Sequence, residues 1–215
     1  MNACQGFRIF TVAAAGLLFA LTASAQSNST TSGSTTSSTP NAPAPGTFNQ
    51  RRDNQQDRIA NGIQSGQLTA GETKNLETKE ADINHEAQQM RSQDDGHLTA
   101  ADRAKLNRQQ NATSRQIYQD KHNANTAHYG NNEVGQRREN QQDRIAQGVR
   151  SGQLTAGETA RLEHQQQNIN HQVAADRSAN GGKLTPGEKQ QVNKEQNQAS
   201  KNIYNKKHNQ ATRKQ

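Results

Sequence analysis

Apolar residues are sparse along this chain, and where they occur they keep the spacing of one helix face. Ile59 and Ile63 are four residues apart, and Leu76, Ile83 and Ala87 follow one another at intervals of seven and four. Such intervals place side chains on one side of an α-helix. The residues between them are mostly Gln, Glu, Lys, Arg and Ala, which favour helices, and no alternating strand pattern of useful length appears. The sequence therefore predicts an all-α fold.

The helical pattern returns at an offset of 86 residues. Residues 50–128 match residues 136–214 at 40 of 79 positions without a gap. An internal repeat of this kind is typical of a duplicated structural unit. The sequence therefore predicts two tandem helical copies, residues 48–130 and 131–215, each with a short helix followed by two longer ones.

Four short sequence motifs of the form G-x-L-T-x-x-[ED], two in each copy, separate the expected helices. The first lies in the stretch SGQLTAGET, residues 65–73, which returns unchanged at residues 151–159. A threonine three residues before an acid is typical of a capping box. The threonine oxygen accepts a bond from the third helical amide, and the acid accepts one from the threonine amide. We expect this arrangement at Thr69 with Glu72, Thr99 with Asp102, Thr155 with Glu158, and Thr185 with Glu188.

The four motifs also resemble the second half of an EF-hand calcium loop. Placing Gly66 at loop position 6 puts Leu68 at position 8 and Glu72 at position 12, where that loop has an aliphatic residue and its last ligand. The resemblance implies paired helix–loop–helix units. The early ligand positions of the first loop, however, hold Asn61 and Ile63, which lack the carboxylates that calcium requires.

Only the second loop, residues 91–102, keeps several carboxylates. Asp94, Asp95 and Asp102 are its candidate calcium ligands, and they would form a weak site. The resemblance thus implies loops that have mostly lost their ligands. We expect no cofactor, with weak calcium binding as the alternative.

A second resemblance concerns the segments LTAADRAKLNRQQN and LTPGEKQQVNKEQN, which begin at Leu98 and Leu184. They are similar to the LTxxQ segments of small periplasmic stress chaperones, which are exported, basic and helical. The last motif position is acidic in this chain, as at Asp102 and Glu188, where those chaperones have glutamine. The resemblance implies, as a further alternative, a chaperone that holds unfolded clients.

The N-terminal residues have the pattern of an export signal. Arg8 precedes a thirteen-residue apolar stretch, residues 9–21, and Ala23-Ser24-Ala25 provides small residues for cleavage. Thirteen helical residues span about 20 Å, too little for a hydrocarbon core of about 30 Å. We therefore expect a signal peptide at residues 1–25 and a disordered Ser/Thr/Pro linker at residues 26–47. The mature protein would be periplasmic or secreted, without a transmembrane segment.

The composition argues against an enzyme. The single cysteine, Cys4, belongs to the expected signal, and residues 26–215 contain only 19 Leu, Ile, Val and Phe residues. A core that small does not favour a deep substrate pocket, and the chain contains no nucleophile or nucleotide-binding motif. The sequence therefore predicts a non-enzymatic binding module.

Charge suggests the kind of partner. The formal net charge is +7, and every Lys or Arg after residue 195 follows the last acid, Glu195, with no further acid. Such cations favour a protein or an anionic cell-envelope component as the partner, whereas export and the lack of stacking aromatics argue against nucleic acid. The candidate contacts are Lys201, Lys206, Lys207, Arg213 and Lys214.

Overall fold

The computed structural model describes residues 47–213, and this part of the chain forms six α-helices without a strand. The all-α prediction is confirmed. The expected signal peptide and all but the last residue of the expected linker lie outside the described residues. None of the six helices is long and apolar enough to cross a membrane. The helices are α1 (Phe48–Gln64), α2 (Ala70–Gln93), α3 (Ala100–Lys121), α4 (Glu133–Ser151), α5 (Ala156–Ala179) and α6 (Pro186–Lys207).

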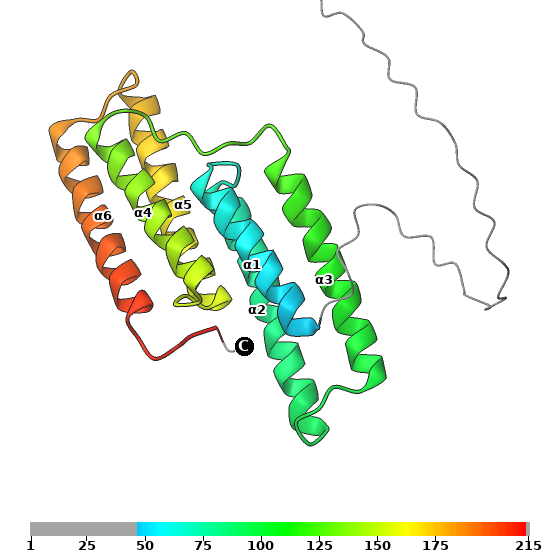
Figure 1. The fold of residues 1–215 in the computed structure, drawn as a ribbon. Helices are drawn as coiled ribbons and strands as arrows, with labels where there is room; N and C mark the ends of the chain where they lie inside the picture. The colour runs from blue at the N-terminus through cyan, green and yellow to red at the C-terminus, as the bar shows by residue number, and fades with distance from the viewer. Residues whose placement is uncertain (1–46, 214–215) are drawn as a thin grey trace, which may run out of the picture. The chain divides into compact units, whose positions relative to one another are not determined.

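The helices pack as two groups of three, α1–α3 and α4–α6, which meet along α2 with α5 and along α1 with α4 (Figure 1). Near the start of α2, Gly71 lies against Gln167 of α5, and near the start of α5, Gly157 lies against Ala81 of α2. The pairing of each helix start with a later part of its partner shows that α2 and α5 run antiparallel. We call the groups the first half and the second half.

A central apolar cluster joins the two halves. Ile59 and Leu76 of the first half and Ile145 of the second are fully buried in it, and Leu162 is nearly so. Each half also has a smaller cluster of its own, around Ile83 in the first and Ile169 in the second. Because the largest cluster belongs to both halves, its burial stabilises their association as well as each helix group.

Glutamines extend this small core. The Gln55 side-chain amide donates to the Gln110 carbonyl at 2.7 Å, and the Gln110 amide donates to the Phe48 carbonyl at 2.9 Å. Both side chains are almost completely buried. These hydrogen bonds link α1 to α3 in addition to the apolar contacts of Ile117 in the central cluster, which explains how a chain with few apolar residues packs three helices. The second half has the same bonds, Gln141 to Gln196 at 2.7 Å and Gln196 to Val134 at 2.9 Å.

The turns that precede α2 and α5 also anchor the segments that follow α3 and α6. Gly66 and Gly152 have φ angles of 70° and 72°, a left-handed conformation that glycine adopts without strain. The Gly66 carbonyl accepts a hydrogen bond from the Ala127 amide at 2.8 Å, and the Gly152 carbonyl accepts one from Arg213 at 2.9 Å. Residues far along the chain are thus held beside these turns.

Removing the cap of α5 is expected to destabilise the fold. The Thr155 hydroxyl accepts from the Glu158 amide at 3.3 Å, and Glu158 accepts from the Thr155 amide at 3.2 Å. Thr155→Ala should lower the free energy of unfolding by about 1 kcal/mol, measured by urea unfolding followed by circular dichroism. Thr155→Ser keeps the hydroxyl oxygen that accepts the capping bond. It should therefore change the free energy of unfolding by only about a few tenths of a kcal/mol. An equal loss in both variants would contradict this role.

Candidate functional site

The predicted capping residues occupy helix starts. Each of the four threonines is the N-cap of its helix and forms both bonds of a capping box with the acid three residues later. The structure adds a fifth box that sequence reasoning missed, formed by Thr47 and Gln50 at the start of α1. Its signal, a threonine three residues before a glutamine, was present in the sequence.

The candidate calcium ligands lie at the turn between α2 and α3. Asp94 is the C-cap of α2, and Asp95 has a positive φ of 49°. The Asp102 carboxylate accepts bonds from the Thr99 hydroxyl and amide, and these bonds lower the pKa of Asp102. Within residues 47–213, no group of three or more His, Cys, Asp or Glu side chains is placed to hold a metal ion. In the first loop of the calcium frame, Ile63 lies inside α1 and is 1% exposed.

The candidate cationic residues near the end of the chain do not share one environment. Lys201, Lys206 and Lys207 lie within α6, where Lys206 is 3.6 Å from the Glu158 carboxylate. Burial lowers the pKa of Lys207. Arg213 turns back onto the fold, where its backbone amide donates to the Gly152 carbonyl, and Lys214 lies outside the described residues.

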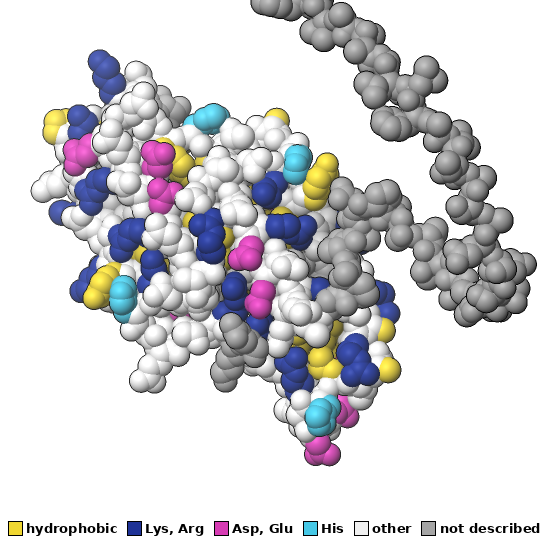
Figure 2. Space-filling model, in the orientation of Figure 1, with side chains coloured by type: hydrophobic (Ala, Val, Ile, Leu, Met, Phe, Trp, Pro, Cys, Tyr) yellow, Lys and Arg dark blue, Asp and Glu magenta, His cyan; other side chains and the backbone are white. Residues whose placement is uncertain are grey.

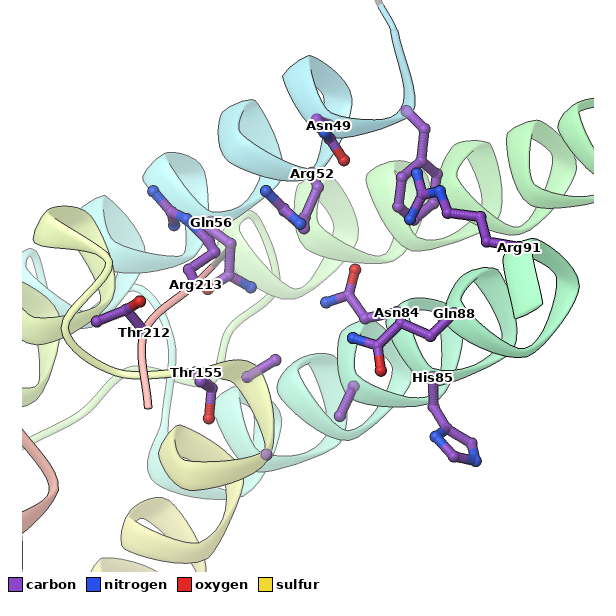
Figure 3. Close-up of a pocket in the computed structure, with 14 residues that line it drawn as sticks. Asn49, Arg52, Gln56, Asn84, His85, Gln88, Arg91, Thr155, Thr212 and Arg213 are labelled. Atoms are coloured by element: carbon purple, nitrogen blue, oxygen red, sulfur yellow. The ribbon is translucent and has the colours of Figure 1, made fainter. Parts of the chain in front are cut away.

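Arg213 lines a hollow of about 640 Å³ between α1, α2 and the start of α5. Figure 3 shows Arg52 pointing into this space from α1 and Asn84 and Gln88 pointing into it from α2, while His85 points away. Arg91 lies at one end, with its guanidinium 5.5 Å from the centre of the Phe48 ring. We call this space the Arg52 hollow.

Three arginines, Arg52, Arg91 and Arg213, line the Arg52 hollow, and none of the lining residues within 47–213 carries a carboxylate. Arg52 is 7% exposed. The Asp53 carboxylate lies 3.3 Å from the Arg52 guanidinium and 3.2 Å from that of Arg213, so one aspartate orients both cations. The result is a concentration of positive charge held by one half-buried acid.

A second nearby acid, Glu80 of α2, does not cancel this charge at neutral pH. Its side chain is completely buried, and neither carboxylate oxygen has a hydrogen-bond partner among residues 47–213. Burial raises the pKa of Glu80 to about 8, although the charges of Arg52, Arg58 and Arg213 act in the opposite direction. Glu80 is therefore mostly protonated at pH 7.

Two further buried carboxyls lie at the junction of the halves. Glu77 and Glu163 are fully buried, and burial raises the pKa of each to about 8. Each accepts one hydrogen bond of 2.9 Å, from Gln56 and from Gln142 respectively. Because these acids are largely neutral at pH 7, the folded protein is more positive than its formal charge suggests.

The second half has a counterpart of the Arg52 hollow. Arg138, Gln142 and Asn170 stand 86 residues after Arg52, Gln56 and Asn84, and they line a space of about 260 Å³. In this space lies Tyr129, from the segment that joins α3 to α4. The Arg138 guanidinium is 5.3 Å from the centre of its ring. Burial raises the pKa of Tyr129 well above its ordinary value.

The path of the Tyr129 segment depends on Gly135. A Cβ at position 135 would lie 2.0 Å from the Tyr129 carbonyl oxygen and 2.3 Å from that of Gly130. Only glycine permits this approach. The corresponding position in the first half is Asn49, which lines the Arg52 hollow.

A scan against protein-family models, a search of curated proteins and a search of solved structures found no match to this chain.

Sequence reasoning named Arg213 as a candidate contact but missed Arg52 and Glu80. Glu80, Ile83 and Ala87 are spaced by three and four, so Glu80 shares a face with buried apolar residues. Arg52 is three residues before Gln55 and seven before Ile59, both of which are buried. That spacing was a usable signal for both residues, but charged residues are buried so rarely that their default assignment is solvent.

Proposed function

We propose that this protein is an exported, non-enzymatic helical module that binds an acidic segment of a partner protein in the Arg52 hollow. The observation that carries the proposal is the convergence of Arg52, Arg91 and Arg213 on a space that no carboxylate of the described residues lines. Guanidinium groups bind carboxylates through paired, charge-assisted hydrogen bonds. The pattern of residues 1–25 supports export.

The lining residues fit binding better than catalysis. Besides the arginines they are mainly amides and threonines, such as Gln56, Asn84 and Thr155, which donate and accept hydrogen bonds but do not act as bases at neutral pH. His85 is a titratable group that suits proton transfer, and it points away from the space (Figure 3). A charge-recognition site is the chemistry that these groups provide.

A local protein segment suits the charge distribution better than a long polyanion. Lys and Arg side chains are interspersed with Asp and Glu on the face that Figure 2 displays, and Lys206 is paired with Glu158. The hollow is a compact feature, able to hold one or two side chains. A long polyanion would need an extended stripe of cations.

The internal similarity supports a tandem origin for the two halves. Equivalent residues form equivalent bonds, such as Gln56 to Glu77 and Gln142 to Glu163, both 2.9 Å. Tyr118 stacks on His122 as Tyr204 stacks on His208, with ring centres 4.1 Å apart in both. We infer that one half keeps an open site while the other fills the equivalent space with Tyr129.

The proposal is tested by titrating the ¹⁵N-labelled protein with acetyl-(Gly-Asp)₃-amide. We expect chemical-shift changes around Arg52 and Asn84 and weaker binding at high salt, because exposed charges are screened. Arg52→Met should weaken binding about tenfold, which corresponds to the loss of one charge-assisted contact.

Arg138→Met is the matched control, because Arg138 is the counterpart of Arg52 beneath the Tyr129 ring. It should leave peptide affinity unchanged. Shift changes confined to other surfaces, or equal binding by wild type and Arg52→Met, would overturn the proposal.

A further inference from the structure

The two equivalent hollows differ in whether an aromatic ring covers the central arginine. In the second half the Tyr129 ring lies over Arg138 at 5.3 Å. In the first half, the residue 86 positions after Tyr129 is Gln215, which is not aromatic. Phe48, the ring that lines the Arg52 hollow, is paired with Arg91. Arg52 therefore has the same matched neighbours as Arg138, but within residues 47–213 no aromatic ring is paired with its guanidinium.

The sizes of the two spaces agree with this difference. The Arg52 hollow measures about 640 Å³, and the space beside Tyr129 about 260 Å³. The matched lining residues Arg52 and Arg138, Gln56 and Gln142, and Asn84 and Asn170 form both spaces. The larger volume leaves room for an aromatic side chain in the first half.

The orientation of Arg52 suits a stacked ring. Its Nε and Nη2 both donate to the same Asp53 oxygen at 3.3 Å. These two bonds occupy one edge of the guanidinium and hold the group in place. Planar guanidinium groups stack on aromatic faces, and the attraction is stronger where water is excluded. Arg52 is almost completely buried.

The route of entry differs from that of Tyr129. Gly135 allows the Tyr129 backbone to lie against α4, whereas Asn49 at the matching position has a side chain in that path. A ligand therefore enters by its side chain from the open side of the hollow, with its own backbone outside. This geometry suits a ring on an exposed segment of another protein.

We infer that the Arg52 hollow takes an aromatic side chain of the partner, flanked by acidic residues, with the ring over Arg52 as Tyr129 lies over Arg138. The inference rests on the proposed function and names its ligand more closely. The flanking carboxylates contact Arg91 and Arg213 at the rim. The Arg52 hollow in the first half is the recognition site, and Tyr129 over Arg138 in the second half shows how the partner's ring binds.

Three peptides test this inference: acetyl-Gly-Asp-Trp-Asp-Gly-amide, the same peptide with Leu for Trp, and the Trp peptide with Asn for both Asp. The chain has no tryptophan, so tryptophan emission reports the peptide alone. The Leu peptide is measured by displacing the Trp peptide. We expect the Trp peptide to bind about fivefold more tightly than the Leu peptide, and about tenfold more tightly than the Asn peptide.

The variants separate the ring from the charge. Arg52→Lys keeps the positive charge but loses the flat stacking face, so it should reduce the Trp-to-Leu preference to about twofold or less. Arg138→Lys, the matched control, should leave the preference unchanged. Circular dichroism checks that each variant folds, and ¹⁵N shift mapping on the wild type locates the ring independently of any variant.

Each outcome decides between the two claims. Equal, salt-sensitive binding of the Trp and Leu peptides at the Arg52 hollow overturns the aromatic inference and leaves the proposed function standing. Failure of both acidic peptides to bind overturns both claims. A Trp preference that Arg52→Lys leaves intact, or shift changes away from the hollow, overturns the inference.

Discussion

Replacing Glu80 with glutamine is expected to raise the free energy of unfolding by about 5 kcal/mol at pH 9 and by only about 1 kcal/mol at pH 5. Burial raises the pKa of Glu80 in the folded protein to about 8, above the value near 4.3 of an unfolded glutamate. The protonated form is therefore favoured by folding. Its contribution to stability is complete below about pH 4.3 and is lost as the pH rises to about 8.

The surroundings of Glu80 determine how far its pKa rises in the folded protein. Arg52, Arg58 and Arg213 favour its ionised form, and the neighbouring Glu77 is itself buried. Urea unfolding of wild type and Glu80→Gln at pH 5, 7 and 9 measures the effect. Glu77 and Glu163 also have a raised pKa, so the variant should keep a smaller decline toward alkaline pH.

The chain supplies a matched control at the equivalent position in the second half. Gln166 stands 86 residues after Glu80, and its side-chain amide donates to the Gln141 side chain at 3.1 Å. Gln55, the counterpart of Gln141, has a buried oxygen without a protein partner. Glu80→Gln should supply that donor, and Gln166→Glu should introduce new alkaline sensitivity. Identical pH profiles for wild type and Glu80→Gln would contradict the role of Glu80.

Gly135→Ala is expected to cost about 3 kcal/mol of unfolding free energy, as severe overpacking does. The added methyl would lie 2.0 Å from the Tyr129 carbonyl oxygen. Because the obstacle is backbone, the segment must move and withdraw the Tyr129 ring from Arg138. The pKa of Tyr129, which burial raises, should then fall toward its ordinary value, and absorbance titration of the phenol measures that fall.

Gly187→Ala is the control for this substitution. Gly187 lies near the start of α6, and a Cβ there meets no atom within 4 Å. Alanine favours helix more than glycine does, so this variant should be neutral or slightly stabilising. Equal unfolding free energies for Gly135→Ala and Gly187→Ala would show that the Tyr129 segment does not depend on Gly135.

Local chemistry determined the helices of this protein. The spacing of Leu76, Ile83 and Ala87 predicted a helix, and the structure has α2 at residues 70–93 with all three side chains buried. Thr69 and Glu72 are three residues apart, and their capping bonds involve only neighbouring backbone. Such features depend on contacts within a few residues, so the sequence alone contains them.

Tertiary structure alone decided the site. Arg52, Glu80 and Arg213 come from α1, α2 and the segment after α6, and they meet only when the two halves pack. A sequence pattern assigns such charged residues to solvent by default, since burial of a charge is costly unless it is paired or neutralised. Here Asp53 pairs with the arginines, and Glu80 takes up a proton. The position of Tyr129 over Arg138 also depends on tertiary structure. Gly135, six residues later, leaves room for the Tyr129 backbone, whereas the matching position in the first half, Asn49, has a side chain.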